Sequence, residues 1–306
     1  MTKKIQNNLH YFKVSQNNPE DSLDDFYIFD KKNLSLEEYT TNIKEIKNFL
    51  ITIKTLKGKK EKSAVIKKYF LNLQSLLNKF SNCSEFVCFV NACDNTLDAV
   101  KDDIKLLERI TDRYFQNRVL NEIVPEEWVQ AILDTNASRK KGKCGEIKLK
   151  AILKENGFDE VKKWDDFFSR AKCVVSFSKA FNLKKVRKNL NVRIKTKKQN
   201  KTLDLIIKCG DKIFLLEAKH LNTSGGGQDK QISELIEILS LKESSQKIYY
   251  ISFLDGNYSN NILSEQVCNE KLQIQREEIQ KYLKQNSNSF WLNTAGFKDL
   301  FKDITQ

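Results

Sequence analysis

The sequence predicts an α/β fold for residues 126–306, preceded by a mainly α-helical N-terminal region over residues 1–125. Three observations lead to this division. Only one of the ten glycines, Gly58, precedes Gly142, and the chain has only two prolines. Apolar residues recur every three or four positions in the first half, as on helices. In the second half, short β-branched and aromatic runs alternate with helical segments, which is the order of a mixed sheet covered by helices.

Three apolar stripes predict the helices of the N-terminal region. Each consists of large apolar residues spaced as on one face of an α-helix. They run from Leu36 to Ile53, from Ile66 to Phe80 and from Leu97 to Tyr114. Ser35 stands three residues before Glu38, in the capping-box form that starts a helix. We therefore expect a helical bundle over residues 35–120, and a new helix and a domain boundary at Pro125.

The C-terminal part predicts helices and strands in alternation. Gly145-Glu146-Ile147 should open a helix that ends at Asn156-Gly157, a good C-terminal stop. Branched and aromatic runs predict strands, over residues 203–207, 213–216 and 247–254. Helical spacing follows over residues 228–241 and 266–282. The order is helix, strand, strand, helix, strand.

Cysteines and apolar runs exclude several classes of protein. The seven cysteines are odd in number and scattered, and only two histidines accompany them, so neither a disulfide framework nor a zinc site is expected. Small buried thiols in a reducing cytoplasm fit better. The N-terminus lacks an apolar signal, and nowhere do about 18 apolar residues run together. We expect a cytoplasmic protein without a membrane partner.

Positive charge is concentrated in one stretch. The chain carries 53 Lys+Arg and 40 Asp+Glu, a formal net charge of +13. Residues 136–200 hold 20 Lys+Arg and 6 Asp+Glu, a local charge of +14, whereas the remainder holds 33 and 34. Lysine-rich codon usage would spread the excess over the whole chain. A localised excess instead indicates contact with a polyanion, nucleic acid above all.

Three charged residues converge if residues 202–219 form a hairpin. With a two-residue turn at Gly210-Asp211, which glycine at the first turn position favours, paired residues have numbers that sum to 421. Asp204 then stands opposite Glu217, with Cβ atoms roughly 5 Å apart. Lys219, two residues further, lies on the same face. Two carboxylates so close repel each other unless a cation neutralises them. Mg²⁺ prefers such oxygen ligands. The simpler alternative is a hairpin without a metal, in which Lys219 forms an edge salt bridge with one of the carboxylates.

Asp204, Glu217-Ala218-Lys219 and the upstream helical Glu146 resemble the core of the PD-(D/E)xK nuclease superfamily, and within it type II restriction endonucleases. The resemblance covers residues 138–255 and departs at Leu203, where the superfamily often has proline. It implies a restriction-endonuclease-like mixed sheet flanked by helices, with the Asp and the E-x-K on adjacent strands. It also implies phosphodiester hydrolysis by a Mg²⁺-activated water, without a covalent intermediate.

The resemblance also assigns roles to residues. Asp204 and Glu217 would hold Mg²⁺ with the backbone carbonyl of Ala218, and Lys219 would position or activate the attacking water. Glu146 either ligates a second metal or orients water, or it caps its own helix, since an acidic residue is favourable in a first helical turn. The candidate DNA contacts are a basic run before the Glu146 helix and the segment after the second strand: Ser138, Arg139, Lys140, Lys141, Lys143, Gly226, Gln228, Lys230 and Gln231.

The sequence thus predicts a type II site-specific deoxyribonuclease of a prokaryotic restriction-modification system. The resemblance implies a homodimer on double-stranded DNA and a companion DNA methyltransferase. A DNA repair or junction-resolving nuclease is one alternative, although junction resolvases are usually smaller. A non-catalytic DNA-binding protein with a decayed site is another, against which the intact Asp, Glu and Lys argue. Residues 1–125 contact bases, mediate dimerisation, or do both.

Overall fold

The computed structural model describes residues 5–27, 35–135, 138–196, 203–223, 225–266 and 269–305, with the backbone alone at residues 135 and 138–142. The chain divides into two compact units. The α/β unit comprises Met1–Ile28 and Arg139–Gln306, and the helical unit comprises Phe29–Ser138. The helical unit is therefore an insertion into the α/β unit.

This division corrects the boundary expected at Pro125. The helix α7 (Glu126–Thr135) begins directly after Pro125, as the sequence predicts, but it belongs to the helical unit. Its Val129 is buried with residues of the preceding helices. The boundary therefore lies at residues 138–139, because the apolar face of α7 has its partners in the helical unit.

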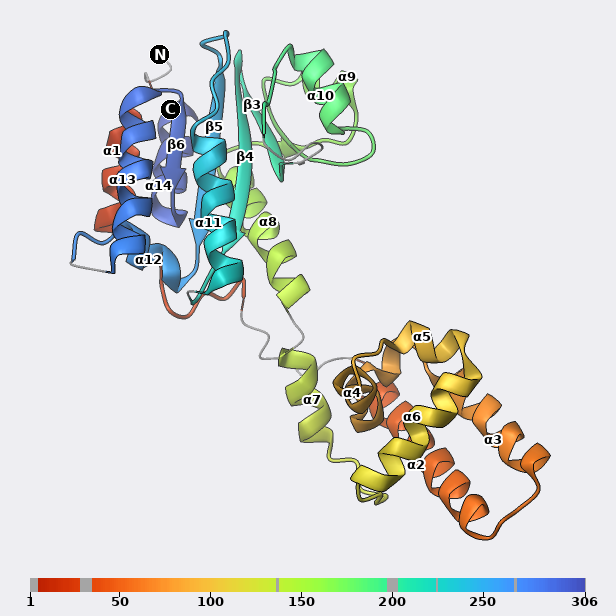
Figure 1. Cartoon of the computed structure of the whole chain (residues 1–306). Helices are drawn as coiled ribbons and strands as arrows, with labels where there is room; N and C mark the ends of the chain where they lie inside the picture. Colours follow the sequence, from red (N-terminus) through yellow and green to blue (C-terminus); the bar gives the residue numbers. More distant parts are fainter. Residues whose placement is uncertain are drawn as a thin grey trace. The chain divides into compact units, whose positions relative to one another are not determined.

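The first residues of the chain belong to the α/β unit and not to the N-terminal helical region in which they were expected. Helix α1 (Asn8–Asn17) packs in the α/β unit against helix α14 (Thr294–Thr305) and strand β6 (Ser289–Leu292) (Figure 1). The Asn8 side-chain amide donates to the Leu283 and Ser289 carbonyls at 2.9 and 2.8 Å. These partners are more than 270 positions away in the sequence, so local patterns do not reveal them.

A six-stranded mixed sheet forms the centre of the α/β unit, as expected. Its strand order is β1-β2-β3-β4-β5-β6. Strands β2, β3 and β4 are antiparallel neighbours, whereas the β1–β2, β4–β5 and β5–β6 pairs are parallel. The strands that precede β6 are β1 (Asp159–Glu160), β2 (Lys172–Ser176), β3 (Leu205–Cys209), β4 (Lys212–His220) and β5 (Ile248–Asp255).

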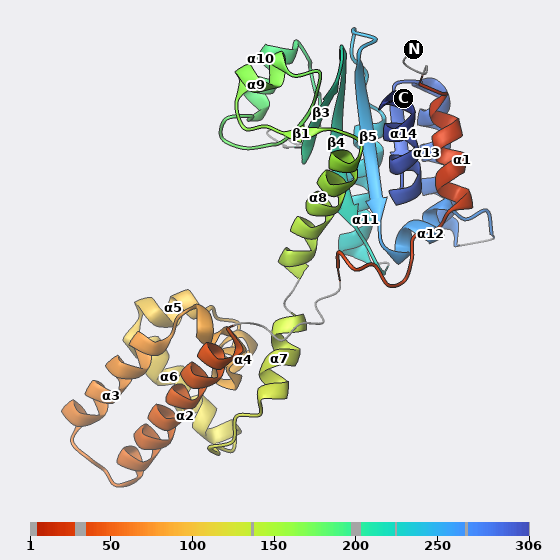
Figure 2. The same cartoon turned by 180° about the vertical axis from the view of Figure 1, so that it is seen from behind.

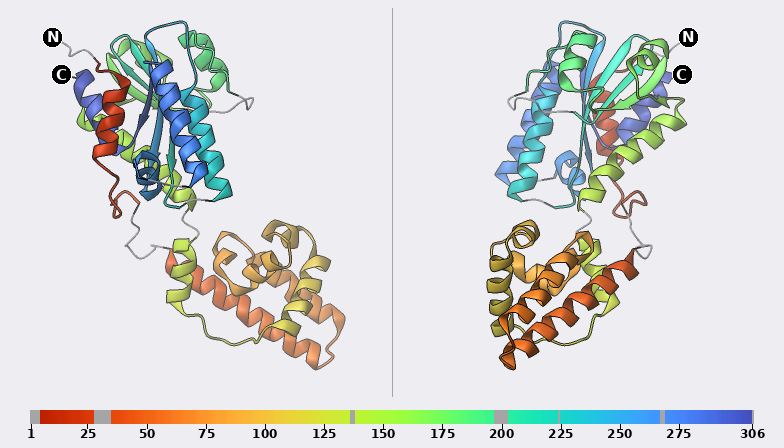
Figure 3. Two further views of the ribbon diagram at one scale, coloured as in Figure 1. Left: turned by 60° about the vertical axis from the view of Figure 1, so that its left-hand side comes forward. Right: turned by 90° about the vertical axis from the view of Figure 1, so that its right-hand side faces the viewer.

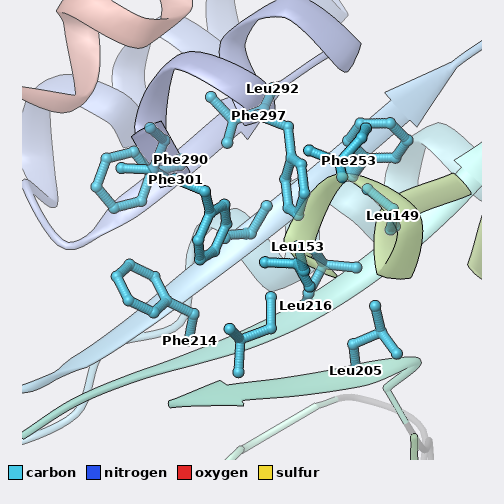
Figure 4. Close-up of a cluster of buried hydrophobic side chains, with 14 of the residues drawn as sticks. Leu149, Leu153, Leu205, Phe214, Leu216, Phe253, Phe290, Leu292, Phe297 and Phe301 are labelled. Carbon is cyan, nitrogen blue, oxygen red and sulfur yellow. The ribbon is translucent and has the colours of Figure 1, made fainter. Parts of the chain in front are cut away.

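Helices cover both faces of this sheet. Side chains of α8 (Ser138–Glu155) and α14 bury one face, which Figure 4 shows in close-up. On the other face lie α11 (Gly226–Leu239) and α13 (Glu270–Gln285), as Figure 3 shows. The remaining helices of the unit are short: α9 (Trp164–Ser169), α10 (Leu183–Leu190) and α12 (Asn257–Leu263). Phe214, Phe253 and Phe301 are fully buried in the first layer.

The helical unit confirms the first apolar stripe as one helix, whereas the second stripe is interrupted at Leu77-Asn78 and the third is divided into two helices at Asp103. Its core contains Leu50, Phe70, Phe86 and Tyr114, all buried. Figure 2 shows α2 and α3 side by side within this unit. Its helices, in chain order before α7, are α2 (Leu36–Gly58), α3 (Ser63–Leu76), the 3₁₀ helix η1 (Lys79–Cys83), α4 (Glu85–Ala92), α5 (Leu97–Asp102) and α6 (Ile104–Asn117).

Two further expectations concern cysteines and membranes. The six cysteines in the described residues are free thiols; Cys83 and Cys173 are buried, whereas Cys88 is exposed. In those same residues, no helix combines the length and apolar character needed to cross a bilayer.

Candidate active site

The β3–β4 hairpin has the register that the sequence predicts. Its strands pair from Leu205 with Leu216 to Cys209 with Lys212, so that partners sum to 421. Gly210 opens the turn with φ of +60°, a conformation that favours glycine. Just before β3, the Asp204 N–H donates to the Leu216 carbonyl at 2.9 Å, one position out of this register, so the regular pairing ends at Leu205. Asp204 nevertheless lies close to Glu217, at the end remote from the turn, because the Ala218 N–H donates to its carboxylate and the Glu217 charge acts on it.

Asp204 is a half-buried carboxylate with an elevated pKa. Burial and the negative charges of Glu217 and, more weakly, Glu146 together raise its pKa to about 7. A bond from the Ala218 N–H to Asp204 Oδ2, 2.7 Å long, and the charge of Lys219 act in the opposite direction. The carboxylates are thus close enough to compete for positive charge, which is the property of a cation-binding pair.

Lys219 supplies positive charge at the same position. Its ammonium donates to Glu217 Oε1 at 2.5 Å and lies 3.9 Å from Glu234 of α11. Burial alone would lower the pKa of Lys219, but Glu217, Asp204 and Glu234 outweigh it and raise the pKa above its ordinary value. Lys219 therefore stays protonated at neutral pH. Glu217 is 2% exposed. Sequence reasoning did not identify Glu234, whose only signal was its helical face.

Glu146 lies beside this group, on a helix that begins earlier than expected. Helix α8 starts at Ser138, so Glu146 occupies its third turn, and the alternative that Glu146 caps its own helix is wrong. The Ser176 hydroxyl, at the end of β2, donates to Glu146 Oε2 at 3.3 Å. Gly145 does not start the helix but admits a neighbour, since a Cβ there would meet the Tyr27 Oη at 3.0 Å.

Glu146 is not an immediate third ligand of the carboxylate pair. Within the described residues, two groups of three acidic or histidine side chains place their ligand atoms within 4.8 Å of one another, and neither contains Asp204, Glu217 or Glu146. The carboxylates that interact most strongly here are those of Asp204 and Glu217. Glu146 adds negative charge at longer range.

The candidate DNA contacts fall on the first two turns of two helices. The basic run forms the start of α8; Lys143 is exposed, while the side chains of Ser138, Arg139, Lys140 and Lys141 lie outside the described ones. The second segment starts α11, which the Gly225 N-cap precedes. There Gly226 and Lys230 are exposed, and Gln228 and Gln231 are half-buried. A Cβ at Gly225 would meet Gln228 Oε1 at 2.7 Å, so this glycine provides room for that amide.

A buried ionic cluster lies next to the site and was not expected from the sequence. The Lys148 ammonium, with its side chain 4% exposed, lies 2.5 Å from Asp24, 2.9 Å from Asp255 and 3.6 Å from Glu20. The Tyr27 hydroxyl donates to Asp255 Oδ2 at 2.7 Å. We call this group the Lys148 cluster; its members are Lys148, Glu20, Asp24, Tyr27 and Asp255.

The Lys148 cluster connects three segments around β4. Lys148 follows Glu146 by two residues on α8, and Asp255 is the β5 partner of His220, the residue after Lys219. The His220 ring stacks on Tyr27 with centroids 3.7 Å apart. Burial and Asp255 raise the pKa of Glu20 to about 7, although Lys148 opposes this. The one sign of this cluster in the sequence is that Lys148 stands four residues before the apolar Ile152, on the face of α8 that is expected to be buried.

Comparisons with protein-family models, with curated proteins and with solved structures find no match for this chain. The chemistry must therefore be inferred from the site itself. Two adjacent carboxylates and a main-chain carbonyl are ligands for a hard divalent cation. An ammonium beside them can orient water or stabilise developing negative charge.

Proposed function

We propose that this protein is a metal-dependent nuclease that hydrolyses phosphodiester bonds in double-stranded DNA, in the manner of a type II restriction endonuclease. One observation carries the proposal. The D-x₁₂-E-x-K residues Asp204, Glu217 and Lys219 meet at one end of a hairpin in a mixed sheet, with Glu146 of a preceding helix nearby. This is the arrangement that the PD-(D/E)xK resemblance implies.

The residues present suit a magnesium ion. Asp204, Glu217 and the Ala218 carbonyl would hold it, because the mutual repulsion that raises the pKa of Asp204 is relieved by a divalent cation. When bound, Mg²⁺ supplies Lewis-acid stabilisation of the phosphate and lowers the pKa of water.

The chain's own side chains complete the chemistry. Glu217 and Glu234 keep Lys219 cationic, so its ammonium orients the attacking water and stabilises the negative charge that grows on the phosphate. The Ala218 N–H fixes one oxygen of Asp204 and thereby its orientation. Glu146, held by Ser176, orients water from the α8 side.

Charge supports a DNA substrate. The basic stretch over residues 136–200 includes the start of α8, the helix that carries Glu146. Lysines there neutralise phosphates, which sets affinity and salt dependence. A homodimer that cuts both strands, a companion methyltransferase that protects host DNA, and action in a prokaryotic cytoplasm complete the proposal.

The test is cleavage of unmethylated phage DNA with Mg²⁺, against an EDTA control. Discrete bands are expected from the wild type, and a loss of at least about 100-fold from Asp204→Ala and Lys219→Ala, with DNA binding retained. The matched control is Asp211→Asn, which removes a carboxylate at the exposed turn of the same hairpin. It should cut at the wild-type rate.

Other outcomes would redirect the assignment. A metal-dependent smear would favour a repair or structure-directed nuclease with the same site. Intact DNA on many templates would favour a DNA-binding protein with a decayed site. Wild-type cleavage by Asp204→Ala or Lys219→Ala would show that the site is placed wrongly.

A further inference from the structure

Helix α6 of the helical unit has one exposed polar face. Its buried side includes Leu107, Ile110 and Tyr114. The opposite side carries five exposed residues at helical spacing: Lys105, Arg109, Arg113, Gln116 and Asn117. The helix is 14 residues long, or ~21 Å, which is long enough to place several of these side chains against one ligand.

A hollow lies beside this face. Its volume is about 510 Å³, and Arg109, Arg113 and Gln116 line it together with Cys93 and Asn95, which follow α4. A second hollow of about 480 Å³ adjoins it, because both share Arg113, Asn117 and Cys93. The lining is rich in guanidinium and amide groups, which is a chemistry for polar recognition.

Positive charge on this face is not explained by the composition of the unit. Residues 35–135 contain 15 Lys+Arg and 15 Asp+Glu, so the unit as a whole is neutral there. Of the 15 basic residues only three are arginines, and all three lie on α6 or directly after it. Arg118 is engaged with Glu85 at 3.4 Å and lies over the Phe89 ring.

The other two arginines are available to a ligand. Among the described residues, Arg109 and Arg113 form no ion pair, and Asp112 between them is already paired with Lys57 of α2. Lysine would suffice to solvate a helix face. Planar guanidinium groups gathered on one face favour recognition of a planar or bidentate acceptor.

We infer that α6 enters the major groove of DNA and reads base edges with Arg109, Arg113 and Gln116. The inference rests on the proposed function for its duplex substrate and names the part of the chain that selects the sequence. An α-helix fits the major groove, where arginine pairs with guanine O6 and N7, and glutamine with adenine N6 and N7. Asn117 is not included, because its amide donates to the Arg113 carbonyl at 2.7 Å.

Exposed lysines supply the accompanying phosphate contacts. They surround the connection between α2 and α3: Lys59, Lys60, Lys62, Lys67 and Lys68. The Lys57–Asp112 pair brings the end of α2 beside α6. Phosphate contacts of this kind position a protein on the duplex without specifying sequence.

The test separates charge from base reading by using the full chain and a pool of randomised DNA duplexes in EDTA, which prevents cleavage. The wild type should enrich a defined motif. Arg113→Lys keeps the charge but removes the bidentate fork, so it should lose preference at one base pair by about 5- to 150-fold, with nonspecific affinity unchanged. The control Lys67→Ala should weaken all sequences alike and lower the salt slope by about 1.

Two results would overturn the inference: a wild type that enriches no motif, or Arg109→Lys, Arg113→Lys and Gln116→Ala variants that all enrich the wild-type motif. Melting curves verify that each variant is folded. If the alanine variant fails to fold, the arginine-to-lysine variants still test the inference, because they keep a long exposed side chain. Cleavage with Mg²⁺ is read separately. If the wild type cuts DNA but the α6 variants keep its sequence preference, only the role of α6 is refuted. If the wild type binds a motif but does not cut DNA with Mg²⁺, only the proposed function is refuted.

Discussion

Lys148→Met should destabilise the α/β unit strongly. The substitution keeps the length of the side chain and removes the one cation that, among the described residues, contacts the carboxylates of Glu20, Asp24 and Asp255. Lys148 and Asp255 are almost fully buried, with side chains 4% and 2% exposed. Loss of the ammonium therefore leaves buried negative charge without its partner.

The magnitude follows from this burial. Removing one partner of a buried ion pair typically costs about 3 to 5 kcal/mol. The Asp24 side chain is 20% exposed, so water solvates its charge in part and reduces its contribution to the loss of stability. Glu20, whose pKa burial raises to about 7, sheds its charge in mild acid. We expect a loss of about 4 kcal/mol at pH 8 and less at pH 6, a large fraction of the stability of a typical domain.

Urea unfolding of the full chain, followed by tryptophan fluorescence, measures this loss. Trp291 is completely buried in the α/β unit, whereas Trp128 of the helical unit is 72% exposed, so the change in emission reports mainly on the α/β unit. The matched control is Lys150→Met, two residues along the same helix. Lys150 pairs with Glu160 at the surface, 2.7 Å away, and such pairs contribute about 0 to 1 kcal/mol.

The reasoning is refuted if Lys148→Met loses no more stability than Lys150→Met. A double variant, Lys148→Met with Asp255→Asn, provides a second check. Removing one of the uncompensated charges should restore part of the lost stability. If the two effects simply add, the carboxylates do not depend on Lys148.

Three shorter predictions follow. Burial raises the pKa of Glu20 from 4.5 to about 7, so between these pH values the folded state binds a proton that the unfolded state does not. As pH rises through this range, the wild type should lose stability relative to Glu20→Gln, by at most about 3 kcal/mol. A stability difference that stays constant in urea titrations from pH 5 to 8 would contradict this. Gly296→Ala should cost about 1 to 3 kcal/mol, because its Cβ would meet Ser15 Oγ at 2.1 Å, whereas Gly227→Ala meets nothing within 4 Å and serves as the control. Mg²⁺ should raise the melting temperature of the wild type and not of Asp204→Ala; equal shifts in both would place the metal elsewhere.

The core of the candidate site was predictable because it is local. Asp204, Glu217 and Lys219 lie within 16 residues, and a two-residue turn with glycine fixes the register of the strands that bring them together. The sheet alternation then puts Lys219 with Glu217. The same rule explains the position of His220 on the other side, where it stacks on Tyr27.

The rest was not predictable because its partners are distant. Glu20, Asp24 and Tyr27 reach the site from the N-terminal segment, more than 100 positions before Lys148 and 200 before Asp255. Helix α8 begins seven residues before the expected start, since its two glycines are tolerated within the helix and Gly145 makes room for Tyr27. Strands β1 and β6 are two and four residues long, too short for a periodic signal.

The insertion of the helical unit fixes an order of events during synthesis. The helical unit is continuous in sequence, so it can fold soon after it leaves the ribosome. The amide of Asn8, however, waits for the carbonyl of Ser289, 281 positions later. At bacterial or eukaryotic elongation rates this delay is about 15 to 60 s. Until then α1 has no sheet to join, so a chain released before β6 presents a finished helical unit on an incomplete α/β unit.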